Sequence, residues 1–125
     1  MKWKRVYICS PLRADTWPGV LRNALKAQSY MELAAVKYNC RAFAPHAYLS
    51  YLLDDNVPDE RALALDFGQK LLTLCDALII CGDTVSEGMR GEIQAAKELG
   101  IPVLLLDKAY GAKIITQIAS KGAAS

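Results

Sequence analysis

The chain has 125 residues, of which 53% are hydrophobic and 22% charged, and its formal net charge is +2. This length and composition predict a single domain over residues 1–125, with one hydrophobic core and one site. Because the basic residues are scattered, we expect no nucleic-acid polymer as a partner, whereas a free nucleotide needs only one or two cations.

The lengths of the apolar segments and the spacing of the cysteines indicate the cellular compartment of the protein. No segment approaches the length of a transmembrane helix, and the apolar run after the basic start, Val6 to Cys9, is too short for a signal peptide. We therefore expect a cytoplasmic protein that does not contact a membrane. The four cysteines form no C-x-x-C pair, so we interpret them as reduced, buried thiols rather than zinc ligands.

The first half of the chain is predicted to form a strand, a long helix and a weak strand. Arg5–Ser10 is a short run rich in β-forming residues. The segment from about Gly19 to Tyr38 carries apolar residues in a wide stripe at helical period. Arg41–Ala44 is a weak second strand that Pro45 stops, and the stretch from His46 to Asn56 has mixed character and is assigned to no element.

The second half is predicted to alternate helices with buried strands. A helix starts near Asn56, which we expect to cap it, with Pro58 and two acids in the first turn, and it runs to about Leu74. The later elements are expected, in order, as a strand over Ala77–Cys81, a polar loop over Gly82–Gly88, a helix from about Met89 to Leu99 that ends at Gly100, a strand over Pro102–Leu106 and a helix over Ala112–Ser120. Both strands are apolar on both faces, as central parallel strands are.

This alternation predicts a doubly wound α/β fold of the flavodoxin or Rossmann type, with a parallel sheet of four to five strands and helices on both faces. Ligands of such sheets bind at the carboxyl ends of the strands, where loops and helix N-termini face one another. Four segments are therefore candidates for the site: Ser10–Asp15, Pro45–Asn56, Gly82–Glu92 and Asp107–Gly111.

The segment that leaves the central strand is the most informative of the four. Glu92 is expected in the first turn of the helix that follows, and Gly88 and Gly91 would leave room for a ligand close to the backbone. The ordinary alternative is a glutamate that only interacts favourably with the helix dipole.

Two residues in and after the first strand add to this candidate site. Tyr7 lies inside the strand, and a buried phenol needs a hydrogen-bond partner, which Glu92 would provide. The alternative is an ordinary core tyrosine. Arg13 follows the strand, where a guanidinium can hold a phosphate or a base edge, although most loop arginines are simply solvated.

His46 and the pair Asp54–Asp55 follow the second strand. A lone histidine is more often a structural residue than a ligand-binding one, and the two acids fit a solvated turn and helix cap. Beside a ligand cleft, however, two carboxylates would also be able to bind ribose hydroxyls.

Four short motifs occur in a fixed order: Tyr7-Ile-Cys-Ser-Pro-Leu-Arg13, then Ala44-Pro-His46, then Cys75-Asp76 before a buried strand, and then Ser86-x-Gly88-x-x-x-Glu92. In this order the chain resembles the nucleoside 2-deoxyribosyltransferase-like family from Val6 to about Val103. The loop and the first strand are most similar to the 5-hydroxymethyl-dUMP N-hydrolase branch of that family.

The resemblance implies a role for each matching residue. Glu92 matches the nucleophile that attacks C1′ of a deoxyribosyl group, and Tyr7 matches the tyrosine that orients it. Ser86 matches a serine that helps to hold the nucleotide in the hydrolase branch, where transferases commonly have aspartate. Arg13 and His46 match residues that line the nucleotide site. The remaining residues that we expect to bind substrate are Ser10, Asp54, Asp55, Gly88 and Met89.

These residue types suit the cleavage of an N-glycosidic bond. The reaction develops oxocarbenium charge, which a carboxylate stabilises or captures covalently. The carboxylate must be ionised to attack, and we expect its place at a helix N-terminus to favour ionisation. The sequence has no metal-ligand cluster and no glycine-rich dinucleotide fingerprint, so we expect no metal and no cofactor.

One position departs from the family pattern. The family usually has an aspartate eight residues before the aspartate of the alanine-aspartate pair that opens the central strand, and it contacts the sugar and assists catalysis. This chain has Gly68 there, and Asp66 points about 200° away around the helix.

Two functions are therefore open at this stage. The first is an N-glycosidase or deoxyribosyltransferase acting on a nucleoside or nucleoside 5′-monophosphate, with Ser86 favouring hydrolysis of a phosphorylated substrate. The second is a nucleotide-binding module that senses or sequesters its ligand without turnover, which the absent aspartate favours. The resemblance also implies a homo-oligomer, because the family pairs subunits around the active site.

Overall fold

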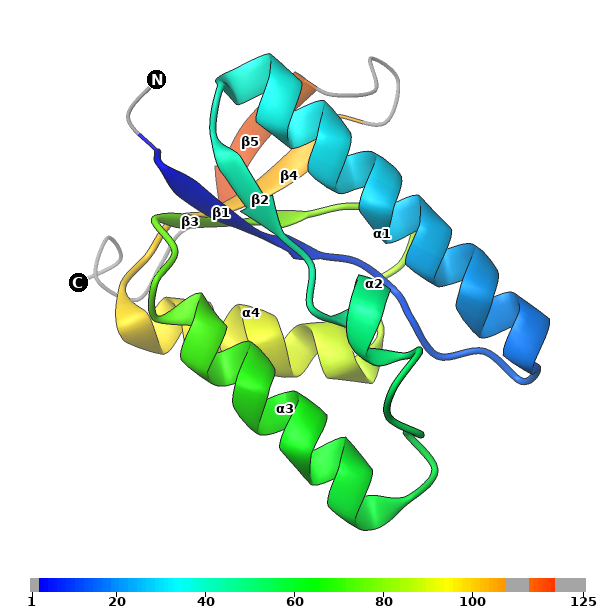
Figure 1. The fold of residues 1–125 in the computed structure, drawn as a ribbon. Coiled ribbons are helices and arrows are strands. Elements are labelled where there is room, and N and C mark those ends of the chain that lie inside the picture. Colours follow the sequence, from blue (N-terminus) through cyan, green and yellow to red (C-terminus); the bar gives the residue numbers. More distant parts are fainter. Residues whose placement is uncertain (1–2, 108–112, 119–125) are drawn as a thin grey trace.

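A computed structural model of the protein describes residues 3–107 and the backbone of residues 113–118 (Figure 1). Its elements are, in chain order, β1 (Arg5–Cys9), α1 (Trp17–Tyr38), β2 (Arg41–Phe43), α2 (His46–Leu49), α3 (Pro58–Leu72), β3 (Ala77–Ile80), α4 (Glu87–Leu99), β4 (Val103–Asp107) and β5 (Lys113–Ile118).

The strands form one sheet in the order β2-β1-β3-β4-β5. Strand β1 pairs in parallel with β2 and β3, and β3 pairs in parallel with β4. These four strands confirm the expected doubly wound fold. The chain leaves β1 towards β2 on one side and later enters β3 on the other, so the strand order reverses between β1 and β3. In such sheets this reversal marks the place where ligands bind, beyond the carboxyl ends of the two strands.

The prediction of a helix over Ala112–Ser120 is wrong for residues 113–118, the part of this segment that the structure describes. Residues Lys113–Ile118 form β5, which runs antiparallel to β4, with Leu104 opposite Gln117. Three consecutive β-branched residues, Ile114 to Thr116, favour a strand, and the free edge of β4 offers them backbone partners. Positions 112, 119 and 120 lie outside the described residues.

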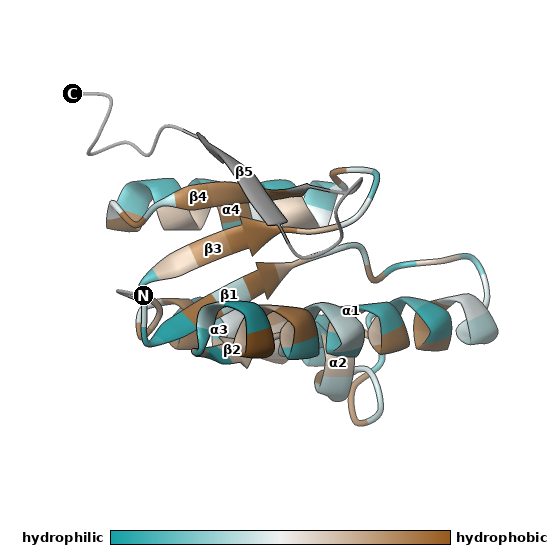
Figure 2. Cartoon of the chain, turned by 90° about the horizontal axis from the view of Figure 1, so that it is seen from above, coloured by the Kyte–Doolittle hydropathy of each residue, from teal (hydrophilic) through white to brown (hydrophobic). Residues whose placement is uncertain are grey.

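Helices cover both faces of the sheet, with α1 and α2 on one side and α3 and α4 on the other (Figure 1). Because side chains along a strand point alternately to opposite faces, Val6 and Ile8 pack towards α1, whereas Tyr7 and Cys9 pack towards α3 and α4. Strands β3 and β4 are hydrophobic over most of their length, while α1 and α4 alternate hydrophobic and hydrophilic residues (Figure 2).

Two helix starts differ from those expected. Helix α3 begins at Pro58 with Val57 as its N-cap, and Asn56 instead donates its backbone N–H to Asp54 Oδ1 at 2.9 Å. Asn56 therefore belongs to the preceding turn. Helix α4 begins at Glu87, two residues earlier than expected, because the Ser86 hydroxyl accepts the Met89 N–H and caps it.

All four cysteines are free thiols; Cys9, Cys75 and Cys81 are buried and Cys40 is partly buried, as small hydrophobic residues would be. Within residues 3–107, no helix combines the length and the hydropathy needed to cross a membrane.

Candidate functional site

A pocket of about 880 Å³ lies at the carboxyl ends of the strands. It is bounded by the loop after β1, the segment from Pro45 to Asn56, the inner side of α3 and the first turns of α4. All ten residues that the sequence analysis placed in the site contribute to its wall: Tyr7, Ser10, Arg13, His46, Asp54, Asp55, Ser86, Gly88, Met89 and Glu92.

Tyr7 and Glu92 meet at the base of this pocket. The Tyr7 hydroxyl donates a hydrogen bond to Glu92 Oε2 with an oxygen–oxygen distance of 2.5 Å. This is the pairing that the sequence analysis expected, and the distance is typical of a phenol bonded to a carboxylate. Tyr7 is 1% exposed, so the packing of β1 against α3 and α4 fixes the position of the donor.

The ionisation of Glu92 differs from the expectation. Burial raises the pKa of Glu92 from 4.5 to about 6, and hydrogen bonds from Tyr7 and Cys9 lower it in part. Because α4 starts at Glu87, Glu92 lies in the second turn of the helix, where the helix dipole has little effect. The predicted help from the helix N-terminus is therefore wrong, and the two donors favour the charged form instead.

Tyr7 is held as a protonated donor. Burial, together with the charge of Glu92, raises the pKa of Tyr7 above its ordinary value of 10. The pair is therefore a neutral phenol bound to a carboxylate, and above about pH 6 that carboxylate is mostly ionised.

Cys9 is a member of this site that sequence reasoning missed. Its thiol donates a hydrogen bond to the Met89 carbonyl oxygen at 3.7 Å, and its interaction with Glu92 lowers the pKa of that carboxyl in part. Burial raises the pKa of Cys9, so the sulfur remains a thiol donor. The available signal was its spacing of two residues from Tyr7, which places both side chains on the same face of β1.

Ser10 and His46 form a second, partly buried polar pair on the pocket wall. Ser10 Oγ lies 2.8 Å from His46 Nε2, and burial lowers the pKa of His46 to about 4. The imidazole is therefore neutral at physiological pH, with one donor and one acceptor. Ser50 follows His46 by one helical turn and also lines the pocket, and its buried Oγ has no hydrogen-bond partner among the described residues.

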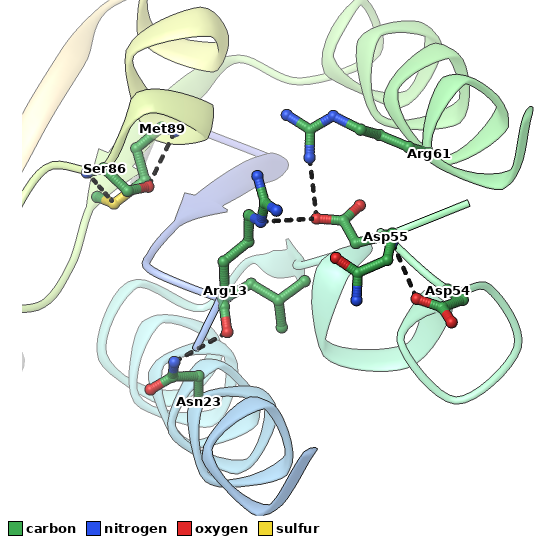
Figure 3. A network of polar contacts seen from close by, with 9 residues as sticks. Arg13, Asn23, Asp54, Asp55, Arg61, Ser86 and Met89 are labelled. Atoms are coloured by element: carbon green, nitrogen blue, oxygen red, sulfur yellow. Dashed lines mark hydrogen bonds and ion pairs between the residues drawn. The ribbon is translucent and has the colours of Figure 1, made fainter. Parts of the chain in front are cut away.

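The pocket lining also includes a cluster of three charged residues, Arg13, Asp55 and Arg61 (Figure 3). Asp55 Oδ2 accepts a hydrogen bond from Arg61 Nη1 at 3.0 Å and lies 3.7 Å from Arg13 Nε. The Asn23 side chain donates to the Leu12 carbonyl oxygen at 2.9 Å and so fastens the loop that carries Arg13 to α1. Sequence reasoning missed Arg61, because an arginine in the first turns of a helix has the pattern of a solvated surface residue.

Asp54 differs from its neighbour Asp55. Its carboxylate accepts the Asn56 N–H within a tight turn, and its own N–H donates to Glu60 Oε1 at 2.7 Å. Asp54 therefore organises the turn that leads into α3, which is the solvated-turn alternative considered from the sequence.

The start of α4 forms the opposite side of the pocket. The Ser86 hydroxyl accepts the Met89 N–H at 3.3 Å, and the Ser86 N–H in turn lies 3.4 Å from Met89 Sδ. The Met89 side chain is 1% exposed, so it packs in the core and supports the cap. A methyl group added at Gly88 or Gly91 would have no atom within 4 Å, so both positions face open space in the pocket wall.

Gly68 lies against Tyr7. A Cβ atom built at Gly68 would stand 3.1 Å from the Tyr7 hydroxyl oxygen, closer than ordinary van der Waals contact. Asp66, the nearest acid along α3, forms an exposed ion pair with Lys70 at 3.1 Å. No carboxylate from this part of α3 therefore replaces the aspartate that Gly68 lacks.

Among residues 3–107, no group of three or more histidine, cysteine, aspartate or glutamate side chains could hold a metal ion. The polar groups of the pocket are instead arranged as the Tyr7–Glu92 pair, the Ser10–His46 pair and the cluster of Arg13 and Arg61 around Asp55.

Fold and pocket together define a doubly wound α/β protein with a pocket where the strand order reverses. A solved structure with this fold is the 2-deoxyribosyltransferase of the psychrotolerant bacterium Bacillus psychrosaccharolyticus, described as a biocatalyst for the synthesis of nucleosides. It superposes with a TM-score of 0.59 and 19% sequence identity, over 90% of this chain and 77% of the other. The chain belongs to the family described as domain of unknown function DUF7768, which matches residues 4–106. Its sequence matches no curated protein.

Proposed function

We propose that the protein cleaves or transfers at the N-glycosidic bond of a deoxynucleoside or nucleoside 5′-monophosphate, with Glu92 as the nucleophile. The observation that carries this proposal is the hydrogen bond of 2.5 Å between the Tyr7 hydroxyl and the Glu92 carboxylate at the base of the pocket. The similarity in fold to a 2-deoxyribosyltransferase supports the same class of substrate.

In the proposed reaction, a Glu92 carboxylate oxygen forms a bond to C1′ of the sugar while the bond from C1′ to the base nitrogen breaks. The base leaves with that electron pair and takes up a proton from solvent. Tyr7 and Cys9 hold the carboxylate in position, which matters most in the transition state. Water, or a second base, then attacks C1′, loses a proton and releases Glu92 as a carboxylate.

Hydrolysis of a nucleotide is the form of the reaction that we propose, as in the 5-hydroxymethyl-dUMP N-hydrolase branch. Ser86 stands where transferases commonly have aspartate, so this side of the pocket has one negative charge fewer. Its hydroxyl accepts a backbone N–H, which leaves the hydroxyl proton available to donate to a ligand oxygen. The acceptor that resolves the glycosyl-enzyme is then water.

A nucleotide-binding module without turnover is the second candidate. Gly68 favours it, because α3 brings no carboxylate beside Tyr7 and Glu92 to assist at the sugar. In that case the polar pairs of the pocket would recognise a ligand, and Glu92 would bind a sugar hydroxyl rather than attack C1′.

Release of free base from a panel of nucleosides and nucleoside 5′-monophosphates, followed by chromatography, separates the two candidates. Base release that Glu92→Gln abolishes supports the enzyme. Binding of the same compounds without base release contradicts it and favours the module.

We also propose a homo-oligomer, in keeping with the family resemblance. The side chains of Leu63, Phe67 and Leu74 are exposed and fall on one stripe of the α3 helix and its C-terminal end. A second subunit would cover this stripe, and sedimentation of the wild type against Phe67→Glu tests the assembly.

A further inference from the structure

We propose that Arg13 and Arg61 together form the binding site for the 5′-phosphate of a nucleotide, and that Asp55 is their counter-ion when no phosphate is bound. The inference rests on the proposed function for the rest of the ligand, the sugar and the base. The phosphate site itself would exist whether or not the protein turns its ligand over.

The three residues converge from separate parts of the chain. Arg13 lies in the loop after β1, Asp55 in the connection from α2 to α3, and Arg61 in the first turns of α3. In Figure 3 the two guanidinium groups approach the same carboxylate oxygen, Asp55 Oδ2, at 3.0 Å from Arg61 and 3.7 Å from Arg13. Their side chains are not deeply buried, so a ligand in the pocket can reach both.

The charges of the pocket leave an incoming phosphate one place to bind. Among the described residues that line the pocket, Arg13 and Arg61 are the only lysine or arginine side chains, and His46 is neutral because burial lowers its pKa to about 4. The other charged residues of the lining are acidic, Glu92 among them, and they repel a phosphate. The phosphate is therefore directed to the arginine pair while the sugar lies towards Glu92.

Among the described residues, the two guanidinium groups make a single side-chain hydrogen bond. The contact of 3.7 Å from Arg13 to Asp55 is too long for a hydrogen bond, and Arg61 donates one. Each guanidinium has five N–H donors in a fork that matches phosphate oxygens. Within the cluster the two guanidinium groups share one carboxylate, Asp55, and with Asp54 and Glu60 close by they are the positive part of a pocket whose other charged residues are acidic.

Asp55 has a different role in this arrangement from the ribose binding considered from the sequence. Its carboxylate keeps two like charges close together in the empty site, and it repels a phosphate that arrives between them. Asparagine at this position would keep an oxygen to accept the Arg61 N–H and would lose the negative charge. Removing the charge is therefore expected to strengthen phosphate binding.

Calorimetric titration with 2′-deoxyuridine 5′-monophosphate and with 2′-deoxyuridine tests the site. We expect Arg61→Ala and Arg13→Ala each to weaken binding of the monophosphate by about tenfold or more, while binding of the nucleoside changes by less than about twofold. Asp55→Asn should tighten binding of the monophosphate severalfold. Added salt should weaken the monophosphate more than the nucleoside.

Arg90→Ala is the matched control, because Arg90 is exposed on α4 and does not line the pocket, so it removes the same charge elsewhere. Equal losses for nucleoside and monophosphate, or an Arg61→Ala variant that binds like Arg90→Ala, would overturn the inference. If the arginines favour binding of the monophosphate but no base is released, the phosphate site is supported and the proposed enzyme is contradicted. If base is released but the arginines do not favour the monophosphate, the enzyme is supported and the phosphate site is contradicted.

Discussion

The backbone of Gly68 lies directly against the hydroxyl of Tyr7, so that a Cβ atom at this position would stand 3.1 Å from the phenol oxygen. The same hydroxyl is 2.5 Å from Glu92 Oε2. Helix α3 therefore limits where the Tyr7 hydroxyl can lie, and through it the position of the carboxylate. A side chain on residue 68 would have to share this space with Tyr7.

Gly68→Ala is accordingly expected to slow base release while the protein stays folded. The added methyl group displaces the Tyr7 hydroxyl by a few tenths of an ångström and lengthens its hydrogen bond to Glu92, which should lower kcat by roughly tenfold. Rates from single-turnover assays, with circular dichroism to check folding, measure this effect. A folded variant with an unchanged rate would show that Tyr7 does not need its present position.

Glu92→Gln is expected to lower the rate of base release by at least about a thousandfold, as loss of a nucleophile does in other enzymes. The same substitution is expected to stabilise the folded protein. The pKa of Glu92 is about 6 in the folded protein and near 4.5 when unfolded, so between these values the folded state binds more protons. Stability contributed by this group therefore falls as the pH rises from about 4.5 to 6.

At pH 7 this difference in pKa means that the ionised Glu92 lowers the free energy of unfolding by up to about 2 kcal/mol. Glutamine carries no charge and should remove this destabilisation. Urea unfolding at pH 7 and pH 4.5 measures the gain, which should be large at pH 7 and small at pH 4.5. Exposed Glu98→Gln is the control, and equal shifts for both variants would contradict the buried carboxylate.

Tyr7→Phe is expected to lower kcat by roughly tenfold to a hundredfold and to leave ligand affinity nearly intact, because orientation matters most in the transition state. Loss of the Tyr7 hydrogen bond, which lowers the pKa of Glu92, should also move that pKa above 6. The acidic limb of the kcat profile should therefore shift to higher pH in the variant. An unshifted limb would mean that Tyr7 is an ordinary core residue.

His46 is expected to stay neutral down to about pH 5, because burial lowers its pKa to about 4. Between pH 4 and 6.5 the unfolded chain binds the extra proton, so stability from His46 rises with pH across this window, opposite in sign to Glu92. Chemical shifts of the single histidine ring, followed by NMR from pH 3.5 to 8, give this pKa directly. A ring that titrates near 6.5 would contradict the partly buried pair with Ser10.

The sequence alone determined the architecture wherever local pattern and burial agree. Strands β1, β3 and β4 are short runs of large apolar residues, and the long helix α1 has an apolar stripe at helical period, so their types follow from hydrophobic periodicity. The sequence also predicted that the candidate residues lie together, because loops after parallel strands meet at the same edge of the sheet, and the structure places them around one pocket.

Features that depend on contacts between distant segments follow only from the tertiary structure. Strand β5 exists because the free edge of β4 offers pairing, which a local pattern does not report. Arg61 and Arg13 come together because the tertiary structure brings α3 and the loop after β1 to the same carboxylate, that of Asp55. The pKa of Glu92 is set by burial and by donors on β1, since electrostatic environment comes from packing around a group and not from its neighbours in sequence.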